Sequence, residues 1–196
     1  MRFLAALLLT TTAALALPPV QKPDAKPPAA KPNSKPQVVS IDQLFAQLKK
    51  AESTEEAKPI EAKLEAMFRV SGSPSVDLLM TRAQALLVAQ DSKTALKLVQ
   101  SVTQIAPNYA EGWHVRAAME SASDDDTNAL ISLQRVVALN PRQFSAMVEL
   151  ASMLEDYGDK KGALKLYRQA LALDPQLDVA QRKIRELTTS VEGRDI

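Results

Sequence analysis

Few residues in this chain of 196 could take part in catalysis or bind a metal ion. His114 is the only histidine, no cysteine is present, and the five glycines are too scattered to build a phosphate-binding loop. Glu111 is the only second ligand that the segment around His114 offers, and no serine or aspartate lies at a spacing that suggests a catalytic triad. We therefore predict no catalytic site, no metal site and no cofactor, and a protein that is not an enzyme.

A run of three aspartates, Asp124, Asp125 and Asp126, is the other candidate for ion binding. The run lacks the alternating ligands and the central glycine of a calcium-binding loop. Negative charge is favourable at the start of a helix, so a charged turn before a helix explains the run more simply.

The elements that must carry these residues repeat with a period of 34 residues. The recurring residues are the prolines Pro107, Pro141 and Pro175, the alanines Ala95, Ala129 and Ala163, and the aspartates Asp91, Asp125 and Asp159. Proline ends a helix, a small residue lets two helices approach closely, and an aspartate before a helix can cap its free N–H groups. The period therefore predicts stacked pairs of helices.

This pattern resembles the tetratricopeptide repeat, a helix-turn-helix unit of the same length. The resemblance implies an all-α fold, a right-handed α-solenoid closed by a C-terminal capping helix. The predicted segments are a signal peptide (1–16), a Pro/Lys-rich disordered linker (17–39), a degenerate helix pair (40–75), three repeats (76–109, 110–143 and 144–177), a capping helix (178–192) and a tail (193–196).

The degenerate pair departs from the repeats because Leu48 and Ile60 stand where small residues belong. Ser40 with Gln43, and Ser53 with Glu56, predict capping boxes at the starts of its two helices. Pro59 predicts a late start or a kink in the second helix. In the same way, Asp178 is predicted to cap the last helix.

The N-terminus has the features of an export signal. Arg2 precedes an apolar stretch over 3–15, and Ala14-Leu15-Ala16 is a small-x-small cleavage site. We predict cleavage after Ala16, no stable membrane insertion afterwards, and a periplasmic location; the alternative is an uncleaved anchor.

The linker is basic, with four lysines against one aspartate between Pro18 and Pro36, a formal charge of +3. We predict a solvated, extended spacer. The alternative is weak attraction to anionic lipid or polymer. A nucleic-acid site is not expected, because no aromatic residue interleaves the lysines.

The resemblance also implies that the first helix of each repeat lines a concave binding face. The partner-binding residues predicted on this face are Asp77, Met80, Gln84, Val88, Glu111, His114, Val115, Ala118, Val148, Glu149 and Ser152, with Thr81, Leu87, Ser121, Ala122, Ser145, Glu155 and Asp156 at the remaining positions. Members that hold the C-terminal carboxylate of a chaperone use lysine, arginine and asparagine there, and this chain has none of these at those positions. We therefore predict an apolar or basic peptide, or a partner helix, as the ligand.

Glu120 occupies a position that is Leu86 and Leu154 in the other two repeats. An unpaired buried carboxylate is costly, so we predict that Glu120 is partly exposed or paired with Arg116, one turn before it. The alternative is a loosened middle repeat that opens for a partner.

Taken together, these features predict a non-catalytic protein-interaction adaptor of the bacterial cell envelope. Two alternatives remain open: a holdase-like periplasmic chaperone, and an accessory factor of an envelope assembly pathway such as cytochrome c maturation or cell division.

Overall fold

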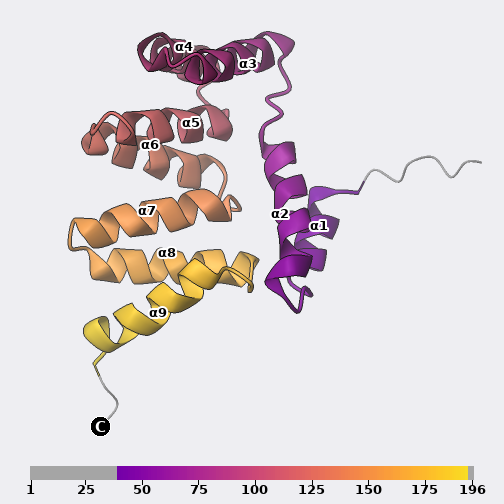
Figure 1. Ribbon diagram of the computed structural model, residues 1–196. Coiled ribbons are helices and arrows are strands. Elements are labelled where there is room, and N and C mark those ends of the chain that lie inside the picture. Colours follow the sequence, from indigo (N-terminus) through magenta and orange to yellow (C-terminus); the bar gives the residue numbers. More distant parts are fainter. Residues whose placement is uncertain (1–38, 194–196) are drawn as a thin grey trace, which may run out of the picture. The chain divides into compact units, whose positions relative to one another are not determined.

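The three predicted repeats are three pairs of helices that follow one another in chain order (Figure 1). The structure is a computed structural model that describes residues 39–193, so the predicted signal peptide and nearly all of the predicted linker lie outside the described residues. Within this range the chain forms helices and no strand. The helices are α1 (Ile41–Leu48), α2 (Thr54–Phe68), α3 (Pro74–Val88), α4 (Ser92–Ile105), α5 (Ala110–Ser121), α6 (Asp126–Leu139), α7 (Phe144–Asp156), α8 (Lys160–Leu173) and α9 (Asp178–Val191).

From α3 to α9 each helix packs against the next one along the chain. The recurring small residues Ala95, Ala129 and Ala163 are all buried, as predicted, and so are Ala83, Ala117 and Ala151 on the first helix of each pair. Large apolar side chains such as Val99, Leu133 and Tyr167 fill the space beside them. The all-α solenoid with a terminal helix packed on α8 is therefore confirmed.

The repeating aspartates cap the second helix of each pair. Asp91, Asp125 and Asp159 accept hydrogen bonds from the backbone N–H groups of Thr94, Asn128 and Gly162 at 3.1, 3.4 and 2.9 Å. The same role was predicted for Asp178, and there the prediction is wrong. Leu177 is the N-cap of α9, and Asp178 lies inside its first turn, where its charge is still favourable.

Glu120 is buried, with 2 % of its surface exposed, and it is fully paired. Arg116 donates to one carboxylate oxygen at 2.7 Å, and the Ser132 hydroxyl donates to the other at 2.6 Å. The guanidinium of Arg116 also lies 5.2 Å from the ring centre of Trp113. The predicted ion pair is confirmed, and a loosened middle repeat is not needed to accommodate the charge.

The first helix pair, α1 and α2, does not stack in front of α3 as another repeat. Its buried Leu44, Phe45, Leu48 and Leu64 share a core with residues of α7 and α8, whereas Ala83 of α3 belongs to a different core with α4 and α5. Leu48 and Ile60 explain the difference, because large residues at the small-residue positions prevent the close approach that stacking requires. We call α1 and α2 together the hairpin.

Polar and aromatic contacts fix the hairpin on α7 and α8. Arg142 donates to Asp42 at 2.6 Å, and its guanidinium lies 3.9 Å from the ring centre of Phe45. Phe45 also meets Phe144 edge to face, with ring centres 6.5 Å apart. Just after the C-terminal end of α8, the side chain of Gln176 donates to the carbonyl of Ala51 at 2.8 Å.

Of the two capping boxes predicted in the hairpin one is complete, and the late start predicted from Pro59 is not observed. The capping box of Ser40 and Gln43 is reciprocal, and Ser53 accepts from the N–H of Glu56. The Glu56 side chain, however, accepts from Glu52 and not from Ser53, so the second box is incomplete. Pro59 was predicted to cause a late start or a kink, and the late start is wrong, because α2 begins at Thr54 and continues through the proline.

Because Ala129 is fully buried where α6 meets its neighbours, we expect Ala129→Leu to overpack this crossing. The free energy of unfolding should fall by about 1–3 kcal/mol. Ala172→Leu makes the same change at an exposed alanine of α8 and should alter stability by under about 0.5 kcal/mol. Urea melts of both variants would test the assignment, and equal losses would contradict it.

Candidate functional site

A pocket of about 500 Å³ lies where α3, the start of α5 and the segment after α2 come together. We call it the groove. Its lining residues are Arg69, Val70, Asp77, Met80, Thr81, Gln84, Leu87, Tyr109, Glu111 and Val115. The structure thus brings together most of the predicted concave-face residues of the first repeat with Glu111 and Val115 of the second.

The other predicted site residues lie outside the groove. Val88 is 83 % exposed at the end of α3, whereas Leu87, which was predicted on the same face, lines the groove. Ala118 and Ser152 are exposed elsewhere, and Val148 packs against the hairpin and α8. His114 and Glu149 pair with each other, as described below.

Three lining residues were absent from the predicted site. Tyr109 is the last residue of the first repeat, and a large aromatic residue between two helix pairs is a signal that could have identified it. Arg69 and Val70 follow α2, and no periodic signal marks them, because the hairpin lies outside the repeat pattern.

Hydrogen bonds hold two sides of the groove in place. Asp77 accepts from the hydroxyl of Ser71 at 2.6 Å and from its N–H at 3.0 Å, which keeps the pKa of Asp77 below its usual value. The Tyr109 hydroxyl donates to the carbonyl of Arg69 at 2.6 Å. Burial, reinforced by nearby carboxylates, raises the pKa of Tyr109 to about 12. At neutral pH the groove therefore presents a charged carboxylate opposite a neutral phenol.

A polar cluster closes the groove on the side of α7. His114 Nε2 lies 3.0 Å from Glu149, its Nδ1 lies 3.4 Å from Glu111, and the side-chain amide of Gln143 lies 2.9 Å from both Glu111 and His114 Nδ1. Burial opposes the charged imidazole, but hydrogen bonds to the two carboxylates outweigh it and raise the pKa of His114 to about 10. The imidazole offsets part of the negative charge that Glu111 brings to the groove.

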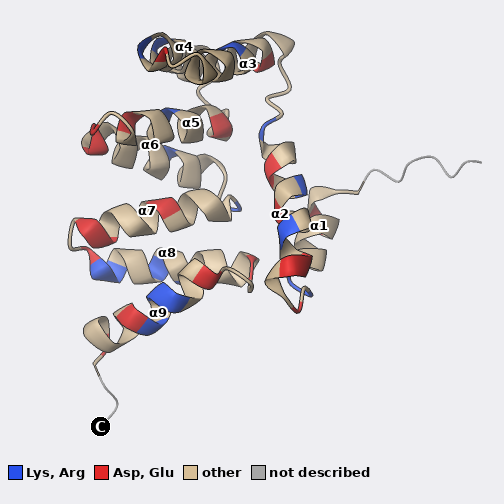
Figure 2. Cartoon of the chain, in the orientation of Figure 1, with Lys and Arg blue, Asp and Glu red and all other residues tan. Residues whose placement is uncertain are grey.

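Two of the carboxylates farther along the predicted face, Glu149 and Glu155, are also paired. Glu155 accepts from Lys183 of α9 at 2.9 Å, and Glu149 is held by His114. In Figure 2, acidic residues lie on α5 and α7, whereas the described basic residues from α7 onward lie on α8 and α9. The negative charge that Glu149 and Glu155 bring to the predicted face is therefore partly neutralised.

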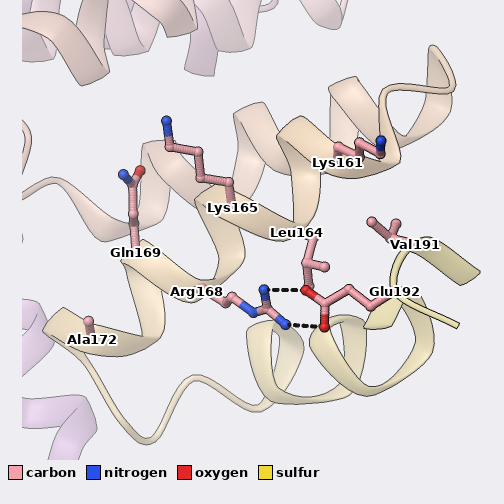
Figure 3. Close-up of a pocket in the computed structure, with 8 residues that line it drawn as sticks. All are labelled: Lys161, Leu164, Lys165, Arg168, Gln169, Ala172, Val191 and Glu192. Carbon is pink, nitrogen blue, oxygen red and sulfur yellow. Dashed lines mark hydrogen bonds and ion pairs between the residues drawn. The ribbon is translucent and has the colours of Figure 1, made fainter. Parts of the chain in front are cut away.

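A second hollow, of about 470 Å³, lies on the outer side of α8 near the end of α9 (Figure 3). Lys161, Lys165 and Arg168 lie along it, and Arg168 donates two hydrogen bonds to Glu192, at 2.7 and 3.1 Å. This hollow is basic, unlike the groove, and none of its lining residues was among the predicted site residues.

Residues 39–193 contain no group of three or more histidine, cysteine or acidic side chains placed to hold a metal ion. None of their helices has the length and apolar character needed to cross a bilayer.

We expect His114→Gln to lower the free energy of unfolding by about 1–3 kcal/mol at pH about 6, because it leaves Glu111 and Glu149 without their shared cation. The folded-state pKa of about 10 lies above the ordinary 6.5. The stability that His114 contributes is therefore complete below about pH 6.5 and is lost as pH rises through about 10. Urea melts of both proteins should converge near pH 10.5. A difference that does not change with pH would contradict the charged cluster.

No family model matches the chain. A tetratricopeptide-repeat-containing protein of Rhizobium etli is 27% identical over 153 residues, which cover 78% of this chain and 75% of the relative. Two solved structures are similar in fold. The first tetratricopeptide repeat domain of Spaghetti (RPAP3), bound to the HSP90 peptide SRMEEVD, has a TM-score of 0.54 and 16% identity, covering 60% of this chain and 93% of that one.

The second is the Yersinia enterocolitica type III secretion chaperone SycD in complex with a peptide of the translocator YopD. It has a TM-score of 0.54 and 13% identity, and the match covers 60% of this chain and 95% of that one. The relative and the first structure carry the repeat that the 34-residue period predicts. The chain therefore has the tetratricopeptide-repeat fold.

Proposed function

We propose that this chain is a non-catalytic adaptor that binds a peptide or a partner helix in the groove, and that it works in the bacterial cell envelope. The observation that supports this most directly is the groove itself. Met80 and Val115 from two successive repeats form an apolar floor, with the carboxylates of Asp77 and Glu111 beside it. Two of the proteins similar in fold were solved with bound peptides.

The chemistry of the groove favours a ligand with apolar side chains and a basic residue. Apolar surface removed from water contributes about 25 cal/mol per Å², so a few anchoring side chains can support micromolar binding after the costs of association. Asp77 and Glu111 would orient a lysine or arginine of the ligand. Arg69 also lines the groove, and its guanidinium lies 3.7 Å from Glu65, which does not line the groove.

We expect the double variant Met80→Glu, Val115→Glu to weaken peptide binding at least about tenfold, because it places two charges on the apolar floor. Leu78→Glu with Val88→Glu is the matched control, since both residues are exposed on α3 and lie outside the groove. Peptides selected from a displayed random library against the wild-type protein would serve as probes, and their affinity would be measured by fluorescence anisotropy. Equal losses in the two variants would contradict binding in the groove.

The same probes distinguish an adaptor from a holdase. An adaptor should select related sequences with apolar and basic residues, and their affinity should fall as salt screens Asp77 and Glu111. Unrelated apolar sequences with salt-independent affinity would instead support the holdase alternative.

We also propose that the protein is exported and that its mature chain begins at Leu17. The basis is the short apolar stretch before Ala14-Leu15-Ala16. Intact mass spectrometry of the protein from the envelope fraction should give the mass of residues 17–196. A species that retains Met1 to Ala16 would overturn this proposal.

A further inference from the structure

A buried carboxylate lies where the hairpin meets the end of α8. Asp174, the C-cap of α8, has no exposed surface. Its Oδ1 accepts from the N–H of Gln176 at 3.0 Å, but its Oδ2 has no hydrogen-bond partner within residues 39–193. The same Gln176 donates to Ala51 of the hairpin, so Asp174 belongs to the contact between the hairpin and the repeats.

The side chain that faces Asp174 from the hairpin is another carboxyl group, Glu61 of α2. Burial, followed by repulsion from Asp174 and by the hydrogen bond that a protonated Glu61 can donate to Asp174, raises the pKa of Glu61 to about 7. Burial likewise raises the pKa of Asp174. The negative charge of Glu65 also raises the pKa of Glu61, and the positive charge of Lys58 lowers it. Asp42 of α1 is paired with Arg142.

Two ionised carboxylates cannot satisfy each other, because both can only accept hydrogen bonds. A proton on Glu61 supplies the donor that Oδ2 of Asp174 lacks, and it removes the repulsion between the two groups. The position of Asp174 at the C-terminal end of α8 further disfavours its negative charge, since the helix dipole is negative there.

We propose that Glu61 and Asp174 form a proton-dependent contact that holds the hairpin on α7 and α8 while they share a proton and weakens that attachment when both ionise. A raised carboxyl pKa means that the attached state binds more protons than the detached one. Attachment is therefore strongest below about pH 4.5, the ordinary value for glutamate. It weakens as pH rises toward 7, and above that it stays weak.

The contact between Glu61 and Asp174 is connected to the groove by α2, which leads directly into one side of the groove. Arg69 and Val70 follow α2 directly and form one side of the groove, where Tyr109 holds the carbonyl of Arg69. Detachment of the hairpin would loosen that side and would uncover Phe144, Met147 and Ala170. This consequence rests on the proposed function, whereas the contact between Glu61 and Asp174 does not.

Hydrogen exchange of the full chain tests the proposal, because exchange reports rare opening even when the attached state dominates. The opening constant of residues 41–68, after correction for the intrinsic exchange rate at each pH, should rise at least about tenfold between pH 5 and 7.5, since one linked proton gives up to about tenfold per pH unit. Residues 92–105 of α4 should show no such rise, because they belong to a core that shares no residue with the core of the hairpin.

Glu61→Gln should abolish the pH dependence, because an amide donates to Asp174 at every pH. Asp174→Asn should reduce the pH dependence, because it removes the repulsion on Glu61, and it keeps the test valid if the first variant folds poorly. Glu55→Gln, at an exposed position in the first turn of α2, should retain the wild-type dependence. A wild-type opening constant that does not change with pH, or a pH dependence that survives in Glu61→Gln, would overturn the proposal.

Peptide affinity measured at the two pH values separates this proposal from the proposed function. If exchange depends on pH as described but no peptide binds in the groove, the proposed function fails and the proton-dependent contact stands. If peptides bind with an affinity that Glu61→Gln leaves unchanged at both pH values, the contact does not reach the groove.

Discussion

The close approach of neighbouring helices at buried alanines is the constraint on which the rest of the structure depends. Ala95, Ala129 and Ala163 have no exposed surface, and each lies four residues after the aspartate that caps its helix. The cap fixes where the helix begins, so the alanine meets the neighbouring helix in the same register in every repeat. This register places α3 and α5 so that Met80 and Val115 share the floor of one groove.

Features set by contacts within or between adjacent repeats could be predicted from the period, and these include the helix pairs, the caps and most of the groove. At the end of α3 only one of the two predicted residues, Leu87, lines the groove, whereas Val88 is exposed outside it. The position of the hairpin could not be predicted, because Asp42 and Arg142 lie 100 residues apart in the sequence. Leu48 and Ile60 indicated only that ordinary stacking would fail.

The two buried acids, Glu120 and Asp174, differ in how their charge is satisfied. Glu120 receives a donor on each oxygen, from Arg116 and Ser132, so its ion pair is compatible with a closely packed repeat. Its partner Arg116 lies one turn away, which is why the sequence predicts the pair. Asp174 has a donor on one oxygen only, and the group opposite the other is an acid from a distant helix. Local spacing carries no signal for such a pair.

The equivalent turn in the preceding repeat shows what the acid at position 174 adds. Asn140 stands before Pro141 as Asp174 stands before Pro175, and its side-chain oxygen accepts from the N–H of Arg142 at 3.2 Å, just as Asp174 accepts from Gln176. An amide therefore forms this turn as well as a carboxylate does. What differs is that the hairpin covers Asp174, while Asn140 stays half-buried. The turn does not need an acid, so the effect particular to Asp174 is the sensitivity to protons that it gives the attachment of the hairpin.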